Sequence, residues 1–146
     1  MSKSKKTSDD SRIAKLAEEH AKQFDKFTEI EGLIIRGHIL VERQLNYAIE
    51  RHVANKNEYK DNRFTFSQKM ILSQMLGITK HFKLELKHLN TLRNQIAHSL
   101  DFDKNRVDMI IKEVHKKKKE ILDLKENRSK NFAIAISFIC GAISAT

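Results

Sequence analysis

One short stretch of the chain combines side chains that could break a phosphodiester bond. Residues 93–98 read Arg-Asn-Gln-Ile-Ala-His, so Arg93, Asn94 and His98 bring a guanidinium, an amide and an imidazole together. Histidine, with an ordinary pKa of about 6.5, is the side chain suited to moving protons near neutral pH. Arginine keeps its positive charge there and can stabilise the charge of a phosphorane. This set predicts metal-free cleavage of RNA through the 2′-hydroxyl.

The spacing decides how these side chains can be arranged on a helix. Asn94 and His98, at positions i and i+4, share a face. The step from Arg93 to His98 turns a helix by about 140°, so Arg93 must reach around with its long side chain. The same residues also suit the polar edge of an ordinary amphipathic helix, and that alternative stays open.

The helix expected to carry them covers about residues 84–100. Its apolar residues recur at three- and four-residue steps, which is typical of a core-facing stripe. They are Leu86, Leu89, Leu92, Ile96 and Leu100. Residues 101–105 (Asp-Phe-Asp-Lys-Asn) have turn chemistry, so we expect His98 near the helix end, where it can face a cleft.

At this point the chain resembles the HEPN superfamily, many of whose domains are metal-independent endoribonucleases. Arg-Asn-Gln-Ile-Ala-His, late in the fourth expected helix of a small helical chain, is similar to the HEPN motif. The layout is similar to that of the mannitol-repressor branch. Residues 35–42 (Ile-Arg-Gly-His-Ile-Leu-Val-Glu) open a helix, residues 64–69 (Phe-Thr-Phe-Ser-Gln-Lys) open a shorter one, and residues 89–92 (Leu-Asn-Thr-Leu) lead into the motif. The HEPN-like core covers residues 33–104, about half of the chain.

The resemblance implies a helical bundle that forms a homodimer, with Arg93 and His98 of both protomers in one cleft. The chemistry favours the same arrangement, because transesterification needs two proton-transfer groups and the motif supplies one histidine per chain. Two-fold symmetry would supply the second. Some superfamily members have lost activity, so the alternative from another class is a non-catalytic helical regulator that binds protein or nucleic acid.

Composition bounds the fold. The 146 residues are 40% hydrophobic, and with no Pro and only four Gly they favour long uninterrupted helices. We therefore expect an all-α bundle of five to six helices in one domain at residues 11–146, after a disordered basic arm at residues 1–10. The single Cys140 cannot form an internal disulfide, and no apolar leader starts the chain, so we expect a cytoplasmic protein.

The charge indicates an anionic partner. The formal net charge is +9 and the sequence pI is about 9.7, which fits an RNA substrate. Lys116 to Lys119 form an uninterrupted run in an expected helix. This run is either a solvated helix face or a track that leads phosphates to the cleft.

Apolar spacing predicts the remaining elements. We expect helices at residues 11–30, 33–53, about 67–76 and 105–127, with breaks at Gly32 and Gly77, a polar loop at residues 55–62, and Thr65 or Ser67 as a cap. An apolar helix at about residues 130–143 is too short for a membrane span, which needs about 20 residues, so a core or dimer-interface helix is favoured over a membrane anchor. Gly141 and Ala142 would allow close helix approach there.

Other candidates rank below the motif. His38 and His52 lie on the apolar stripe of the second helix, where a lone histidine is more often a hydrogen-bonded core residue. Arg36 and Glu42 are second-tier candidates, because a carboxylate there could orient Arg93 or the imidazole. Ordinary surface ion pairs are the simpler account, such as Glu31 with Arg36 or Glu42 with Arg43.

We assign the predicted chemistry to three residues. His98 acts as general acid or base, Arg93 holds the scissile phosphate, and Asn94 fixes the imidazole or donates to the phosphate. No His, Cys and carboxylate set has zinc spacing, and no Gly-rich phosphate loop is present, so we expect neither a metal nor a cofactor. An RNA-cleaving enzyme of this kind would suit a toxin or phage-defence protein that a partner such as an antitoxin restrains.

Overall fold

The fold is entirely helical over the part of the chain that the structure describes. The computed structural model describes residues 11, 15, 29–99 and 101–146. It contains six α-helices, a 3-10 helix and, within those residues, no strand, which confirms the all-α prediction. The elements are α2 (Glu29–His52), α3 (Lys56–Asp61), α4 (Phe66–Met75), α5 (Lys83–Ser99), α6 (Lys104–Lys117), η1 (Lys119–Ile121) and α7 (Arg128–Ser144). The expected arm at residues 1–10 and most of the expected helix at 11–30 lie outside the described residues.

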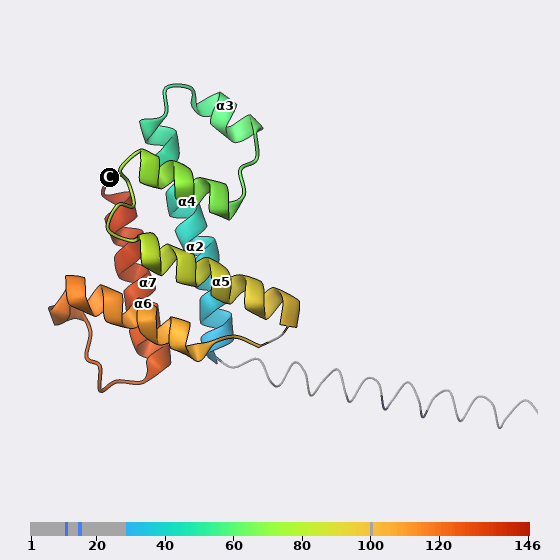
Figure 1. Ribbon diagram of the computed structural model, residues 1–146, viewed down its shortest axis with the longest axis vertical. Helices are drawn as coiled ribbons and strands as arrows, with labels where there is room; N and C mark the ends of the chain where they lie inside the picture. The colour runs from blue at the N-terminus through green and yellow to red at the C-terminus, as the bar shows by residue number, and fades with distance from the viewer. Residues whose placement is uncertain (1–10, 12–14, 16–28, 100) are drawn as a thin grey trace, which may run out of the picture.

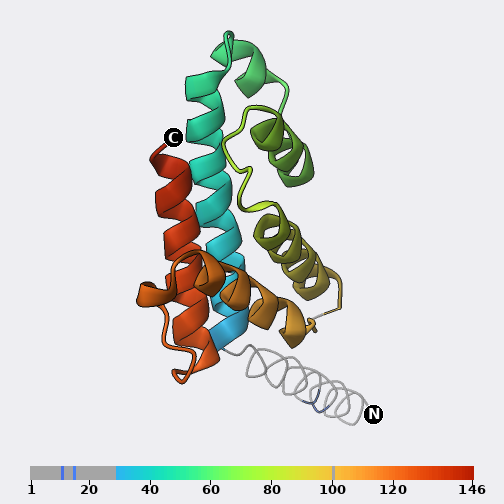
Figure 2. The same ribbon diagram turned by 60° about the vertical axis from the view of Figure 1, so that its left-hand side comes forward.

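The two long helices α2 and α7 lie side by side and run in the same direction (Figures 1 and 2). They approach closely at Gly37, where an added Cβ would lie 3.3 Å from two carbons of Ile136. Near their carboxyl ends, Arg51 Nη2 donates a hydrogen bond to the carbonyl oxygen of Ser144 at 3.3 Å. Within the described part of the chain, nothing lies within 4 Å of a Cβ added at Gly141, so Gly141 is not where α7 approaches α2.

The apolar segment near the carboxyl end is a core helix. Several residues of α7 are fully or almost fully buried. They are Phe132, Ala135, Ile136, Ile139 and Ile143. Among the described helices none is both long and apolar enough to cross a membrane. Packing against α2 explains the nearly continuous apolar sequence that was expected of a core or interface helix.

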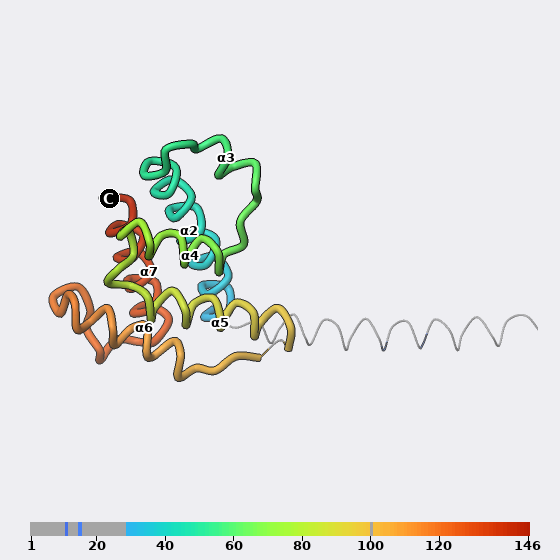
Figure 3. Tube along the Cα trace, turned by 45° about the horizontal axis from the view of Figure 1, so that its top comes forward, coloured from blue at the N-terminus to red at the C-terminus, as the bar shows by residue number. Residues whose placement is uncertain are grey.

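Helices α5 and α6 form an antiparallel pair that crosses α2 and α7 (Figures 1 and 3). One buried ion pair joins them: Lys117 Nζ donates to the carboxylate of Glu85, whose side chain is 1% exposed. The helix expected at 105–127 ends early, because Lys118 adopts a non-helical backbone with φ −149° and ψ 80°. The chain then turns back so that Leu122 packs into the core. The lysine run therefore straddles a helix end.

Two further boundaries differ from expectation. Gly32 lies inside α2 and does not break it, and a Cβ added there would meet only open space. The loop expected at residues 55–62 contains α3, because the Asn55 side chain accepts a hydrogen bond from the backbone N–H of Glu58 and caps the helix. Tyr59 of α3 is buried, and its hydroxyl donates to Asn46 Oδ1 at 2.6 Å.

Candidate functional site

Helix α5 anchors one face in the core and presents a polar face that carries the motif. Four of the five apolar residues predicted to face the core are buried on α5, and Leu100 lies outside the described residues. The four are Leu86, Leu89, Leu92 and Ile96. On the polar face, Asn90, Asn94 and His98 follow at steps of four, with Arg93 beside them. Because a helix rises about 1.5 Å per residue, Asn94 lies about 6 Å along the axis from both Asn90 and His98. We call these four residues the polar stripe.

A pocket of about 310 Å³ opens beside this stripe, where α2, the start of α4 and α5 meet. Its lining is mainly polar and comes from all three helices. The lining residues are His38, Glu42, Thr65, Phe66, Ser67, Asn90, Arg93 and Asn94. The structure thus places two of the three assigned residues, Arg93 and Asn94, in one pocket with Glu42.

The start of α4 is held in place by its cap. Thr65 accepts from the backbone N–H of Gln68 at 3.2 Å, and the Gln68 side chain accepts from the backbone N–H of Thr65 at 2.8 Å. This capping box confirms Thr65 as the cap and satisfies two N–H groups that a helix start otherwise leaves open. Gly77, with φ +76°, follows the end of the helix as expected. The cap thereby fixes Phe66 and Ser67 at the pocket wall.

The imidazole of His38 is the most enclosed polar group of the pocket. The residue is 6% exposed, and its ring lies 4.0 Å from the Phe66 ring, centroid to centroid. Its Nε2 lies 3.3 Å from Asn90 Oδ1, while Asn90 Nδ2 donates to Ser67 Oγ at 3.2 Å. Asn90 therefore links all three helices. Burial lowers the pKa of His38, and the positive charges of Arg93 and Lys69 act in the same direction; the Asn90 hydrogen bond and the Glu42 carboxylate oppose the shift.

One of the two positive charges in and beside the pocket, that of Lys69, is paired with a carboxylate. Lys69 Nζ, from α4, lies 2.7 Å from Glu42 Oε1, and the Lys69 side chain is 12% exposed. Glu42 therefore pairs across to α4, whereas the sequence suggested Arg43 as its partner. No carboxylate of the described residues forms an ion pair with Arg93, whose Nη1 donates to Asn94 Oδ1 at 3.4 Å. The guanidinium thus remains available to an anion.

His98 lies apart from the other two assigned residues. It is exposed in the last turn of α5 and does not line the pocket that holds Arg93 and Asn94. It nevertheless stays on the polar stripe, one helical turn beyond Asn94. Arg36, the other second-tier candidate, is exposed on α2 and is not part of the pocket lining either.

Sequence reasoning gave too little weight to several pocket residues. His38 was interpreted as a core histidine, Ser67 was expected only as a possible helix cap, and Asn90 and Lys69 received no role. All four fall in the segments that carry the family resemblance, which was the available signal. Their convergence depends on how α2, α4 and α5 pack, and periodicity within one helix cannot reveal that.

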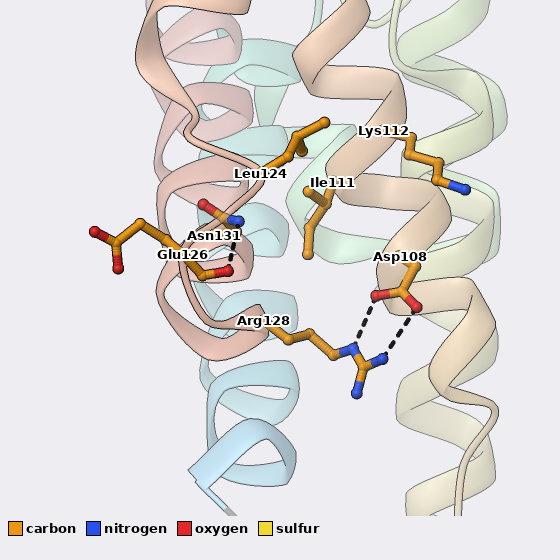
Figure 4. A pocket seen from close by; sticks show the side chains of 7 residues that line it. All are labelled: Asp108, Ile111, Lys112, Leu124, Glu126, Arg128 and Asn131. Atoms are coloured by element: carbon orange, nitrogen blue, oxygen red, sulfur yellow. Dashed lines mark hydrogen bonds and ion pairs between the residues drawn. The ribbon is translucent and has the colours of Figure 1, made fainter.

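A second pocket, of about 470 Å³, lies between α6 and the start of α7 (Figure 4). Its Arg and Asp side chains pair with each other, while Asn131 Oδ1 is a buried acceptor without a hydrogen-bond partner among the described residues. Arg128 forms a fork to Asp108 with N···O distances of 2.8 and 3.2 Å, and Asn131 Nδ2 donates to the backbone carbonyl oxygens of Asp123 and Glu126. No group of three His, Cys, Asp or Glu side chains in the described part of the chain could hold a metal ion. The pocket beside α5 is the stronger candidate site, because it contains Arg93 and Asn94 of the motif.

Comparison of the chain with protein-family models, with curated protein sequences and with solved structures finds no match. Any functional conclusion consequently depends on the geometry and charge of the site.

Proposed function

We propose that this protein is a metal-independent endoribonuclease of the HEPN type. The observation that supports the proposal most is the pocket beside α5, where Arg93 and Asn94 open onto polar walls from three helices. A guanidinium offers a planar set of N–H donors that match phosphate oxygens, and Asn94 Nδ2 adds a neutral donor beside it. Both side chains stand on a helix whose opposite face is buried, which limits their movement.

The proposed reaction is an internal transesterification. The 2′-oxygen loses its proton and bonds to phosphorus, the bond from phosphorus to the 5′-oxygen breaks, and the 5′-oxygen gains a proton. The products are a 2′,3′-cyclic phosphate and a 5′-hydroxyl. Arg93 stabilises the charge on the phosphorane, Asn94 donates to the phosphate, and His98 performs one of the two proton transfers.

The charge of the chain is consistent with such a substrate. A formal net charge of +9 attracts an RNA backbone and raises the rate of encounter. In this proposal a second copy of the chain would bring a second His98 to the cleft. We place the activity in a toxin or phage-defence role, in which a regulatory partner such as an antitoxin restrains it.

The test is a cleavage assay with the purified full-length chain, mixed RNA substrates and excess chelator. Wild-type protein should cleave, whereas Arg93→Ala and His98→Ala should lower the rate by about 10²-fold or more. His81→Ala is the matched control, because His81 is an exposed histidine in the turn between α4 and α5. Its activity should equal that of the wild type. A wild-type protein that is inert toward every RNA would contradict the proposal.

A non-catalytic helical regulator is the second candidate. The observation that favours it is the position of His98 outside the pocket. Such a protein would bind nucleic acid or another protein through the same pocket without breaking a bond. Growth of cells that express the chain separates the two roles further: a toxin arrests growth and Arg93→Ala relieves the arrest, whereas a regulator leaves growth unchanged.

A further inference from the structure

The pocket contains an imidazole that the motif does not supply. His38, from α2, lines it together with Arg93 and Asn94, although the motif supplies only His98. Because the motif has a single histidine, the second proton-transfer group was expected from another copy of the chain, and His38 was expected in the core. In the structure His38 of the same chain lines the pocket.

The two imidazoles lie on opposite sides of the residues assigned to the phosphate. His38 is in contact with Asn90, one helical turn before Asn94, and His98 lies one turn after it. Each turn corresponds to an axial rise of about 6 Å. An in-line displacement needs a base on the side of the attacking oxygen and an acid on the side of the leaving oxygen. A phosphate at Asn94 would have one imidazole in each direction.

The ring of His38 is held by its neighbours. Phe66 packs against it, and Asn90 Oδ1 accepts from Nε2. The donation from Asn90 Nδ2 to Ser67 keeps the amide oxygen toward the ring. A neutral imidazole that donates through Nε2 carries its free lone pair on Nδ1, which can take up a proton. The arrangement of a base with a fixed orienting partner is the one that enzymes use for proton abstraction.

Burial favours the neutral ring of His38 and lowers its pKa. The Asn90 hydrogen bond and the Glu42 carboxylate, one turn along α2, oppose this shift, while the positive charges of Arg93 from α5 and Lys69 from α4 act with burial. The nearby guanidinium also stabilises the negative charge that forms as a hydroxyl loses its proton.

We propose that His38 is the general base of the site. This assignment rests on the proposed function and deepens it. Nδ1 of His38 takes the proton of the 2′-hydroxyl while the 2′-oxygen bonds to phosphorus. His98 gives its proton to the 5′-oxygen as the bond from phosphorus to that oxygen breaks. The two imidazoles then return to their starting protonation states by exchange with water.

Two substrates distinguish the role of the general base from that of the general acid. One is a short RNA, and the other carries sulfur in place of the bridging 5′-oxygen, so that its leaving group departs without a proton. His38→Gln should lower kcat/KM about 10²- to 10⁴-fold on both substrates. His98→Ala should be equally impaired on the RNA but recover most of its rate on the sulfur substrate. His52→Ala is the matched control, since His52 lies on the same helix, is exposed and should leave both rates within about twofold.

The dependence of kcat/KM on pH distinguishes a catalytic role of His38 from a purely structural one. Wild-type kcat/KM should fall on the acidic side as His38 becomes protonated, and His38→Gln should lose this limb. Asn90→Asp keeps the hydrogen-bond acceptor but adds a negative charge beside the ring, which raises the pKa of His38. The acidic limb of that variant should move to higher pH. This second variant keeps the test valid if His38→Gln folds poorly.

The outcomes for the two proposals differ. If wild-type protein cleaves RNA and a folded His38→Gln variant retains its rate and its acidic limb, the assignment of His38 is wrong while the nuclease remains. An unmoved limb in a folded, active Asn90→Asp variant also overturns it. A wild-type protein without any activity defeats the proposed function, and the assignment falls with it.

Discussion

At the scale of single residues, Asn90 organises the candidate site. Its amide oxygen contacts His38 of α2, and its amide nitrogen donates to Ser67 of α4. Each end of the side chain therefore has a partner on a different helix. An apolar replacement would leave the buried imidazole of His38 without that partner, which is costly for a polar group away from water.

His38 should make the stability of the protein depend on pH. Its pKa is lower in the folded state than the ordinary 6.5, so the folded state binds a proton less readily than the unfolded state does. The contribution of His38 to the free energy of unfolding is fully present above pH 6.5. It is lost as the pH falls from 6.5 through the pKa of His38 in the folded state. The free energy of unfolding, measured by urea titration between pH 7.5 and 5, should therefore decline less in His38→Gln than in the wild type.

His88 is a second histidine whose pKa burial lowers, so part of the acid sensitivity should persist in that variant. His52→Ala serves as the control for removal of an exposed histidine from the same helix. An identical acid decline in wild type and His38→Gln would show that the imidazole of His38 is not desolvated in the folded state.

At the scale of elements, the contact of α2 with α7 depends on the size of one side chain. Gly37 permits the close approach to Ile136, whereas Gly32, on the same helix, faces open space. Packing against α7 therefore requires a glycine at position 37, whereas it does not require one at position 32.

Substitutions at these two positions should have opposite effects. Gly37→Leu should lower the free energy of unfolding by about 1–3 kcal/mol, because the added atoms must displace Ile136 from a packed interface. Gly32→Ala should raise it by about 0.4–1 kcal/mol, since alanine restricts the unfolded chain and suits a helix interior. Chemical denaturation of both variants provides the measurement. Equal effects of the same sign would contradict the α2–α7 contact.

At the scale of the whole molecule, part of the positive charge is used in ion pairs within the chain. If His38 is the general base, the proposed site is complete in one chain. Lys117 is paired with Glu85 and Lys116 with Glu113. Half of the lysine run therefore serves intramolecular contacts, and Lys118 and Lys119 are exposed beyond the end of α6. Proton transfer within one chain does not require a second copy, so the proposed mechanism does not depend on the predicted homodimer.

Mixing two inactive variants tests whether a site uses one chain or two. His38→Gln mixed with His98→Ala should remain inactive, since each chain lacks one imidazole of its own site. If His38 of one chain acts with His98 of a partner, heterodimers contain one intact site and activity returns. The molecular mass in solution, measured by light scattering, shows whether dimers are present, and partial unfolding before mixing ensures exchange. Recovery of activity would refute the one-chain site.

Much of the helical framework follows from short-range patterns. Apolar residues at three- and four-residue steps identify α2 and α5, a nearly continuous apolar run identifies α7, and Thr65 or Ser67 as a cap indicates the start of α4. These features depend on neighbours within one or two turns, which a sequence displays directly. The end of α6 was less predictable, because the chain stops there to pack Leu122 into the core.

The sequence by itself predicts an all-α chain with an Arg-Asn-His set on its fourth expected helix. It can do so because helical periodicity and side-chain chemistry are local properties. Three-dimensional packing alone reveals that His38 and Asn90 face Arg93, that Glu42 pairs with Lys69, and that His98 stands outside the pocket. These relations join residues of different helices, and the separations range from 27 to 52 positions for the hydrogen bonds concerned. Contacts over such separations depend on how helices cross, and a crossing is set by the fit of whole helix surfaces.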